Sequence, residues 1–283
     1  MLDRILALGV QPAAYAEAVD LNIQTYDNPT EQIPYLGQWV KTQPVSVGSR
    51  DAPSLEGLTL LQPDLILGEE WQNNPYSLMT QIAPTLILDD YEKPGDFWQT
   101  TITGIAKALE REDRLEELLA EHEQQIVQAR AALQPVLQSY PRVFVISSNV
   151  AATEITLRPL SNTVRLLKEI GFEVVQPENV QRNLGKIEIS AEILSEVEAD
   201  SMVVISAWDD YSKHFKNGIK AEDAMPERWE KVPLLNSLPV SQQDRVFFVD
   251  YYLWGDTISG PLSDKLILEA LPNLLLDSMK EKA

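Results

Sequence analysis

Two short apolar runs, each preceded by the same arrangement of polar and apolar positions, dominate the hydrophobicity pattern of the chain. Residues 54–64 read Ser-x-Glu-x-Leu-x-x-Leu-x-x-Asp and precede Leu65–Leu67. Residues 190–200 repeat this arrangement, with Val for the second Leu, and precede Met202–Ile205. The serine is suited to an N-cap, the glutamate to the first helical turn and the aspartate to the turn before a buried strand. Each half is therefore predicted to contain a helix–turn–strand unit.

A second match lies upstream of each copy and makes the similarity an internal repeat. Residues 4–10 resemble residues 165–172, and both read as a helix that ends at a glycine. Two matches in the same order predict two related lobes. The second half also has an apolar strand at 143–147, for which the first half has no room. We therefore expect the first strand of the first lobe to be missing and the natural chain to begin before Met1.

The region between the two halves has the period of an amphipathic helix. From Thr101 to about Leu133, residues such as Leu115, Leu118 and Ile126 fall on one face, and acids and glutamines fall elsewhere. The pattern predicts a long helix between the lobes. The expected fold is α/β, with parallel sheets in an N-terminal lobe (1–100) and a C-terminal lobe (139–283), joined by an interlobe helix (101–138).

Charge and composition remove several function classes. The chain has 283 residues and a formal net charge of -20. Nucleic acid is excluded as a partner, because phosphate binding needs a basic surface. No apolar run approaches the roughly 18 residues that span a bilayer. There is no cysteine, so thiol catalysis, disulfides and cysteine-based zinc sites are excluded.

Signatures of catalysis are missing as well. The sequence has no G-x-S-x-G, Walker A, G-x-G-x-x-G or H-E-x-x-H motif. Its two histidines are His122, expected on the surface of an acid-rich helix, and His214, which follows a strand end and is a candidate to line a cleft. Acidic residues are too numerous for one pair to indicate a general acid and base. The sequence indicates a binding protein and not an enzyme.

Aromatic and arginine residues gather after the predicted strands, where α/β sheets bind ligands. Tyrosine and tryptophan offer broad, stiff contact surfaces with a polar group, and arginine binds oxygen anions. The candidate ligand-binding residues are Arg50, Trp71, Arg158, Trp208, Tyr211, Tyr251, Tyr252 and Trp254.

Four segments together resemble a known family. They are residues 48–67, which read G-S-R-x-x-P-S-L-E-G-L-x-L-L-Q-P-D-L-I-L, the helix at 103–121, the segment 166–172 and the tail Y-Y-L-W-G-D-T at 251–257. In this order they are similar to ABC-importer substrate-binding proteins of the ferric-siderophore and cobalamin type. The resemblance covers nearly the whole chain. It implies a class III periplasmic binding protein fold, with two Rossmann-like lobes bridged by one long helix.

The resemblance also implies a partner and a location. One glutamate on each lobe would dock onto arginines of an ABC permease dimer in the membrane, and these glutamates correspond to Glu56 and Glu192. Acids in a first helical turn also stabilise their own helix, by roughly 0.3–1 kcal/mol. The chain is expected to act as a monomer in the periplasm, or as an extracytoplasmic lipoprotein, although it contains no signal segment.

Within the family, the sequence is most similar to binders of ferric siderophores of the hydroxamate or citrate-hydroxamate type. The resemblance places Arg50, and less firmly Arg158, at the iron-chelating oxygens. Fe(III) would be held by the siderophore, so no protein-bound metal or cofactor is expected. Alternatives are cobalamin or haem, with Tyr211, Tyr251 or His214 as a haem ligand. An α/β metalloenzyme would need cysteines or clustered histidines, which the sequence lacks.

Overall fold

A computed structural model describes most of the chain, and it divides that chain into two compact units. The described residues are 1–17, 23–70, 75–88, 98–177, 186–207, 218 and 220–280, with side chains described up to 276. Unit 1 consists of Met1–Ala120 and Ile258–Ser263, and unit 2 consists of Glu121–Thr257 and Asp264–Ala283. The lobe boundaries predicted from the sequence remain predictions.

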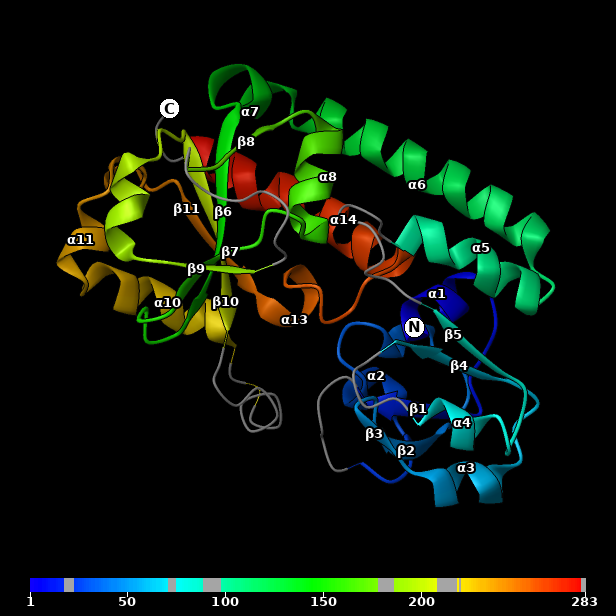
Figure 1. Cartoon of the computed structure of the whole chain (residues 1–283). Helices are drawn as coiled ribbons and strands as arrows, with labels where there is room; N and C mark the ends of the chain where they lie inside the picture. The colour runs from blue at the N-terminus through cyan, green and yellow to red at the C-terminus, as the bar shows by residue number, and fades with distance from the viewer. Residues whose placement is uncertain are drawn as a thin grey trace. The chain divides into compact units, whose positions relative to one another are not determined.

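Unit 1 contains two small sheets (Figure 1). In the first, β2 pairs in parallel with β1 and antiparallel with β3; in the second, β4 and β5 are parallel. Its elements are α1 (Leu2–Ala7), β1 (Ala14–Glu17), α2 (Pro29–Gln32), η1 (Gly37–Trp39), β2 (Val45–Ser49), β3 (Ala52–Pro53), α3 (Leu55–Leu61), β4 (Ile66–Glu69), α4 (Tyr76–Met79), β5 (Thr85–Leu88) and α5 (Trp98–Ala108). Side chains from both sheets and from α3 and α4 form one apolar cluster: Val47, Leu58, Ile66, Met79 and Ala83.

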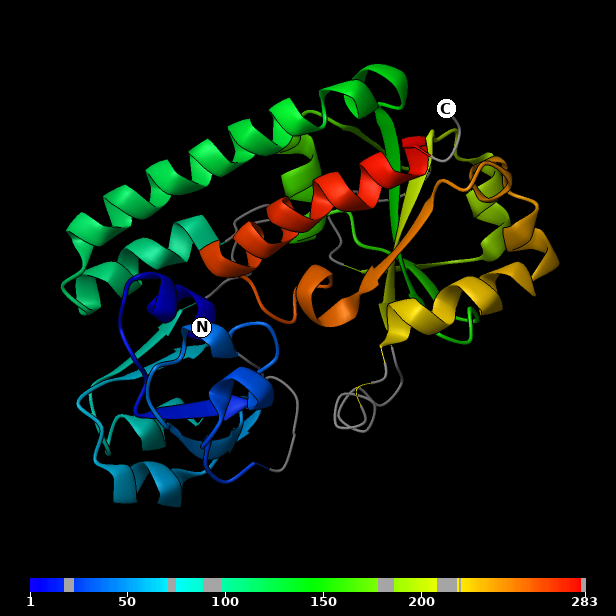
Figure 2. The same cartoon turned by 180° about the vertical axis from the view of Figure 1, so that it is seen from behind.

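Unit 2 is built on a larger mixed sheet with the order β11-β10-β6-β7-β9. Strand β8 also pairs with β6, along its first residues, whereas β7 pairs with the later ones. Helices α8 and α14 lie on one side of it, and α10 and α11 on the other (Figures 1 and 2). The elements are α6 (Glu112–Ala132), which begins in unit 1, α7 (Gln134–Ser139), β6 (Arg142–Asn149), β7 (Ile155–Leu157), α8 (Asn162–Ile170), β8 (Glu173–Val175), β9 (Ile187–Ile189), η2 (Ala191–Glu196), β10 (Ser201–Ala207), α10 (Ala221–Glu230), α11 (Pro233–Asn236), α12 (Pro239–Gln242), β11 (Val246–Asp250), α13 (Tyr251–Trp254) and α14 (Pro261–Lys280).

The parallel strands of unit 2 end at a common edge. Ser206 is in register with Asp250 of β11, and Ala207 with Asn149 of β6. Strands β6 and β10 are buried on both faces, which explains why their sequences read as continuous apolar runs. The α/β fold with parallel strands is confirmed, and the predicted strands correspond to β6, β10 and β11. The sequence did not predict β7, which pairs antiparallel with β6.

Both matches of the internal repeat have structural counterparts. The hydroxyl of Ser54 accepts a hydrogen bond from the Gly57 amide at 3.1 Å and caps α3. The second copy forms the 3₁₀ helix η2 instead of an α-helix. Helices α1 and α8 both end in the same way. The amide of the residue after the terminal glycine bonds to the carbonyl five residues earlier, from Val10 to Ile5 and from Phe172 to Leu167. The glycine before each of these amides has a positive φ, as this ending requires.

The long helix starts later than the sequence pattern predicted. It is α6, and it is separated from α5 by a break at Leu109–Arg111, where Glu110 has φ 53° and the Arg111 amide bonds to the Ala106 carbonyl. A continuous helix from Thr101 is therefore wrong. The break contains neither glycine nor proline, but the acids Glu112 and Asp113 occupy the first turn of α6, where they suit a helix N-terminus.

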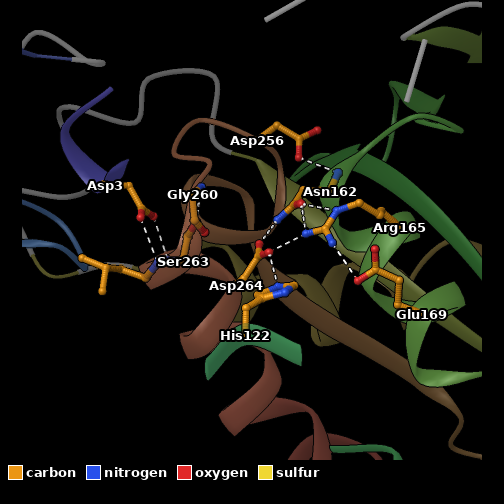
Figure 3. Close-up of polar contacts among 10 residues, drawn as sticks. Asp3, His122, Asn162, Arg165, Glu169, Asp256, Gly260, Ser263 and Asp264 are labelled. Carbon is orange, nitrogen blue, oxygen red and sulfur yellow. Dashed lines mark hydrogen bonds and ion pairs between the residues drawn. The ribbon is translucent and has the colours of Figure 1, made fainter. Parts of the chain in front are cut away.

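A cluster of charged and polar side chains lies in the interior of unit 2 (Figure 3). At its centre is Asp264 of α14, which has no exposed surface. Its carboxylate bonds to His122 Nε2 at 2.9 Å and accepts hydrogen bonds from Arg165 and Asn162 of α8. Arg165 also donates to Glu169 at 2.7 Å. The expectation that His122 is a surface residue is wrong, since it is 8% exposed and bonded to this carboxylate.

The surroundings of Asp264 keep it ionised despite its burial. Burial alone would raise the pKa of its carboxyl, but the Arg165 charge and the bonds from His122 and Asn162 outweigh burial and lower the pKa. A buried carboxylate is tolerated only when it is paired and hydrogen-bonded in this way.

A second buried aspartate performs a capping role in unit 1. Asp3 accepts hydrogen bonds from the Leu262 and Ser263 amides, both at 2.8 Å, at the start of α14 (Figure 3). A Cβ on Gly260 would lie 2.3 Å from Asp3 Oδ1, so only glycine fits there. A carboxylate at a helix N-terminus satisfies unpaired amides and interacts favourably with the helix dipole.

We predict that Asp264→Asn destabilises the protein by about 3–5 kcal/mol, because it removes the buried carboxylate of the cluster and leaves Arg165 with only the partly exposed Glu169 as an ion-pair partner. Urea denaturation followed by circular dichroism measures the loss. The control is Glu227→Gln, which removes the exposed ion pair with Lys231 and should leave the midpoint unchanged. Since the native pKa of Asp264 lies below that of the unfolded chain, its contribution is complete above about pH 4 and is lost as the pH falls through the native value. An Asp264→Asn variant as stable as the wild type would contradict the assignment.

Candidate functional site

Two of the predicted ligand-binding residues, Arg158 and Tyr251, meet in unit 2. Arg158 follows β7, and its Nη1 donates to the Tyr251 hydroxyl at 2.7 Å. Its Nη2 donates to Asp256 Oδ2 at 3.3 Å. The guanidinium carbon lies 5.3 Å from the centre of the Tyr251 ring. Residues 93 and 98 positions apart in the sequence are thus brought together around one guanidinium.

Asp256 was not predicted, although it belongs to the Trp-Gly-Asp segment after the aromatic residues. Its Oδ1 accepts a hydrogen bond from the Asn162 amide at 2.8 Å, at the start of α8. Burial raises the pKa of Asp256, and the Arg158 charge opposes that rise only in part. For Arg158, burial would lower the pKa, but Asp256 and Tyr251 outweigh it and raise the pKa. Arg158 is therefore a permanent cation.

Tyr251 is positioned by its immediate neighbours in the chain. Asp250, the last residue of β11, caps α13 by accepting hydrogen bonds from the Tyr252 and Leu253 amides. Gly255 packs closely against Tyr251, because a Cβ there would be 2.8 Å from Tyr251 Cδ2 and 2.5 Å from the Tyr251 carbonyl oxygen. The glycine thus permits the close approach of ring and backbone.

The arrangement offers hydrogen-bond donors. Arginine has no acceptor atom, so the Tyr251 oxygen accepts from Arg158 and its own proton is directed elsewhere. Arg158 Nε is buried and has no partner among the residues that the structure describes. A phenolic O–H and a guanidinium N–H suit the negatively charged oxygens of an anionic ligand.

Two other predicted aromatic residues, Tyr252 and Trp254, are buried. Tyr252 and Trp254 are 2% and 5% exposed and belong to the core of unit 2. The Trp254 carbonyl accepts a hydrogen bond from the Thr163 hydroxyl at 2.7 Å. Packing explains both side chains, and their contact with a ligand remains a prediction. Four further candidates lie outside the described residues: Trp71, Trp208, Tyr211 and His214.

Arg50 belongs to a separate charged cluster in unit 1. Its amide donates to the Glu17 carbonyl at 2.9 Å, directly after β2. Glu69, the last residue of β4, has a pKa of about 2: burial would raise it, but the Met1 ammonium at 2.7 Å and the charges of Arg4 and Arg50 outweigh burial. Arg50 thus follows strand β2, as the sequence predicted, and its positive charge lowers the pKa of Glu69 at the end of β4.

The two predicted docking glutamates are both exposed and both lie in a first helical turn, Glu56 in α3 and Glu192 in η2. The pKa of Glu192 is lowered by hydrogen bonds from the Glu192 backbone amide and the Ser190 hydroxyl. Both acids are therefore accessible to a partner, and local hydrogen bonds stabilise the charged form of Glu192.

No group of three or more metal-binding side chains occurs within the described part of the chain. Among the helices described there, none combines the length and the apolar character that crossing a membrane requires.

Comparison with known proteins gives a consistent result. A family model described as "Periplasmic binding protein" matches residues 5–253. The Fe(3+)-citrate-binding protein YfmC of Bacillus subtilis is 29% identical over 256 residues, which are 89% of this chain and 71% of that protein. Two similar solved structures are Staphylococcus aureus SirA (TM-score 0.72, 20% identity, 97% of this chain and 95% of that chain) and Vibrio cholerae FhuD with bound Fe3+-Desferal (TM-score 0.73, 20% identity, 98% and 95%).

The two structural similarities agree with the α/β architecture of two units and a long helix, and they confirm the predicted class III fold. The family match covers most of the chain, including both halves of the repeat, Arg50, Arg158 and Tyr251. The chain therefore belongs to the periplasmic binding protein family, and it is a substrate-binding protein and not an enzyme.

Proposed function

We propose that this protein is the extracytoplasmic receptor of an ABC importer, and that it binds a ferric siderophore and delivers it to the permease. The observation that carries the proposal is the Arg158–Tyr251 pair. Among the described residues, none accepts a hydrogen bond from the buried Arg158 Nε or takes the Tyr251 proton. Family membership supports the transport role. The names of the relatives support the ligand class, since YfmC is named for Fe(3+)-citrate and the FhuD structure contains Fe3+-Desferal.

The chemistry of the ligand fits the available donors. The oxygens of a ferric chelate carry concentrated negative charge, which a guanidinium and a phenolic O–H bind through charge-assisted hydrogen bonds. A net charge of -20 repels an anionic chelate, so local cations such as Arg158 and Arg50 must supply the attraction. In this proposal the iron is held entirely by the chelator, of the hydroxamate or citrate-hydroxamate type.

Delivery requires a surface that the permease recognises. We propose that Glu56 and Glu192 provide it and pair with cations of a permease dimer, as the repeat and the exposure of both residues support. Exposed charge pairs of this kind orient partners and speed their encounter more than they add affinity. The receptor would work as a monomer, in the periplasm or anchored as a lipoprotein.

We predict that Arg50→Ala and Arg158→Ala each weaken binding of the ferric chelate by about 1.5–3 kcal/mol, or roughly 10–150-fold, because each removes a charge-assisted hydrogen bond. Tryptophan fluorescence quenching measures the dissociation constants for ferric hydroxamates, ferric citrate, ferric catecholates, cobalamin and haem. Arg111→Ala, at an exposed arginine, is the matched control and should bind like the wild type. Binding of cobalamin or haem alone would reject the ferric-siderophore assignment, and an unchanged dissociation constant would remove the mutated arginine from the site.

We predict that the double variant Glu56→Arg, Glu192→Arg abolishes uptake of radiolabelled iron by membranes that contain the importer, while its affinity for the chelate is unchanged. Charge reversal places like charges against the permease cations, and both residues are exposed. The double variant Glu116→Arg, Glu123→Arg, at exposed positions of α6, makes the same change in net charge and should transport normally. If the double variant loses chelate affinity instead, these glutamates serve the binding site or the fold.

A further inference from the structure

We propose that Asp256 is a positioning residue for ligand binding: it holds the Arg158 guanidinium so that the Tyr251 hydroxyl is directed, as a donor, at an oxygen of the ligand. The inference rests on the proposed function in one respect, namely that the ligand is an anionic ferric chelate. It goes further by assigning a role to a carboxylate that would by itself repel such a ligand.

The two carboxylate oxygens of Asp256 accept hydrogen bonds from different residues. Oδ1 accepts from the Asn162 amide at 2.8 Å, and Oδ2 accepts from Arg158 Nη2 at 3.3 Å (the Asn162 bond is drawn in Figure 3). The Asn162 amide cannot move independently, because the Asn162 side chain bonds to Asp264 and Arg165 within the buried cluster. Asp256 therefore ties a half-buried arginine to a rigid part of unit 2.

The backbone at Asp256 supports a functional reason for its side chain. Asp256 has φ 66°, in the left-handed region that glycine adopts at least cost. The residue before it, Gly255, has a negative φ. Aspartate and asparagine adopt this conformation more easily than other residues that carry a Cβ, but it still costs more than it does for glycine, and strain of this kind is concentrated at functional sites. The two hydrogen bonds of the carboxylate offset that strain.

The position of Arg158 determines the direction of the Tyr251 proton. Arg158 Nη1 donates to the Tyr251 oxygen at 2.7 Å, so the phenolic proton must point away from the guanidinium. No described residue accepts that proton. If Arg158 were released from Asp256, its long side chain would adopt other rotamers, and Tyr251 would lose the partner that fixes the direction of its O–H.

Asp256→Asn separates this proposal from simpler explanations. The amide oxygen can still accept from Asn162, and asparagine tolerates the left-handed conformation, but the amide nitrogen cannot accept from Arg158. If Asp256 only stabilises the start of α8, affinity stays unchanged. If its charge acts only by repelling the anionic ligand, affinity rises. Positioning alone predicts weaker binding.

The experiment measures dissociation constants of the intact protein for ferric citrate and Fe3+-Desferal by tryptophan quenching. We expect Asp256→Asn to bind the chelate that the wild type binds about tenfold more weakly. Asp256→Gly, which suits the backbone and lacks the carboxylate, should bind no more tightly than Asp256→Asn. The matched control is Asp244→Asn, at an exposed aspartate with φ 51° in another turn of unit 2, and it should bind like the wild type.

A double-mutant cycle tests whether Asp256 acts through Arg158. In an Arg158→Ala background, Asp256→Asn should change affinity less than twofold, because the group that it positions is gone. Equal effects of Asp256→Asn in both backgrounds, or unchanged or tighter binding by the single variant, would overturn the inference. Failure of the wild type to bind either ferric chelate would instead reject the proposed function, and the inference with it.

Discussion

The ion pair between Asp264 and Arg165 is the constraint on which the rest of unit 2 depends. Asp264 has no exposed surface, and its charge is tolerated because Arg165, Asn162 and His122 all bond to it. Removing one member would leave the others as uncompensated polar groups in a medium that solvates them poorly. The pair thus fixes helices α8 and α14 together with the second half of α6, which carries His122.

Hydrogen bonds to that buried cluster hold the candidate site in place. The start of α8 is held through the Asn162 side chain, and the Asn162 amide in turn holds Asp256, which holds Arg158. A chain of hydrogen bonds therefore connects the buried charge of Asp264 to the donors of the proposed ligand site. Such support matters for a receptor, since a preorganised donor set loses less conformational entropy on binding than a mobile one.

In the proposed function, the strongly acidic composition is compatible with an anionic ligand because Arg50 and Arg158 act locally. Screening at physiological ionic strength limits the reach of exposed charges to about 8 Å, whereas a half-buried guanidinium with its own hydrogen bonds acts at contact distance. In the same proposal, the exposed Glu56 and Glu192 face a cationic partner. In this proposal, attraction of the ligand and recognition of the permease depend on different residues.

Local patterns in the sequence determined the α/β class and the internal repeat. They also determined the helix endings at Gly9 and Gly171 and the strands β6, β10 and β11. These features could be predicted because hydrophobic period, helix caps and turn residues act over a few positions of the chain. The same patterns identified Arg158 and Tyr251 as candidates but not as partners. The tertiary structure decided that they meet, that Asp256 joins them, that Tyr252 and Trp254 enter the core, and that His122 is buried beside Asp264. It also decided the break between α5 and α6, where Glu110 adopts a conformation that its residue type does not favour. These features depend on contacts between residues about a hundred positions apart or more, or on packing that overrides local preference, and no local pattern contains that information.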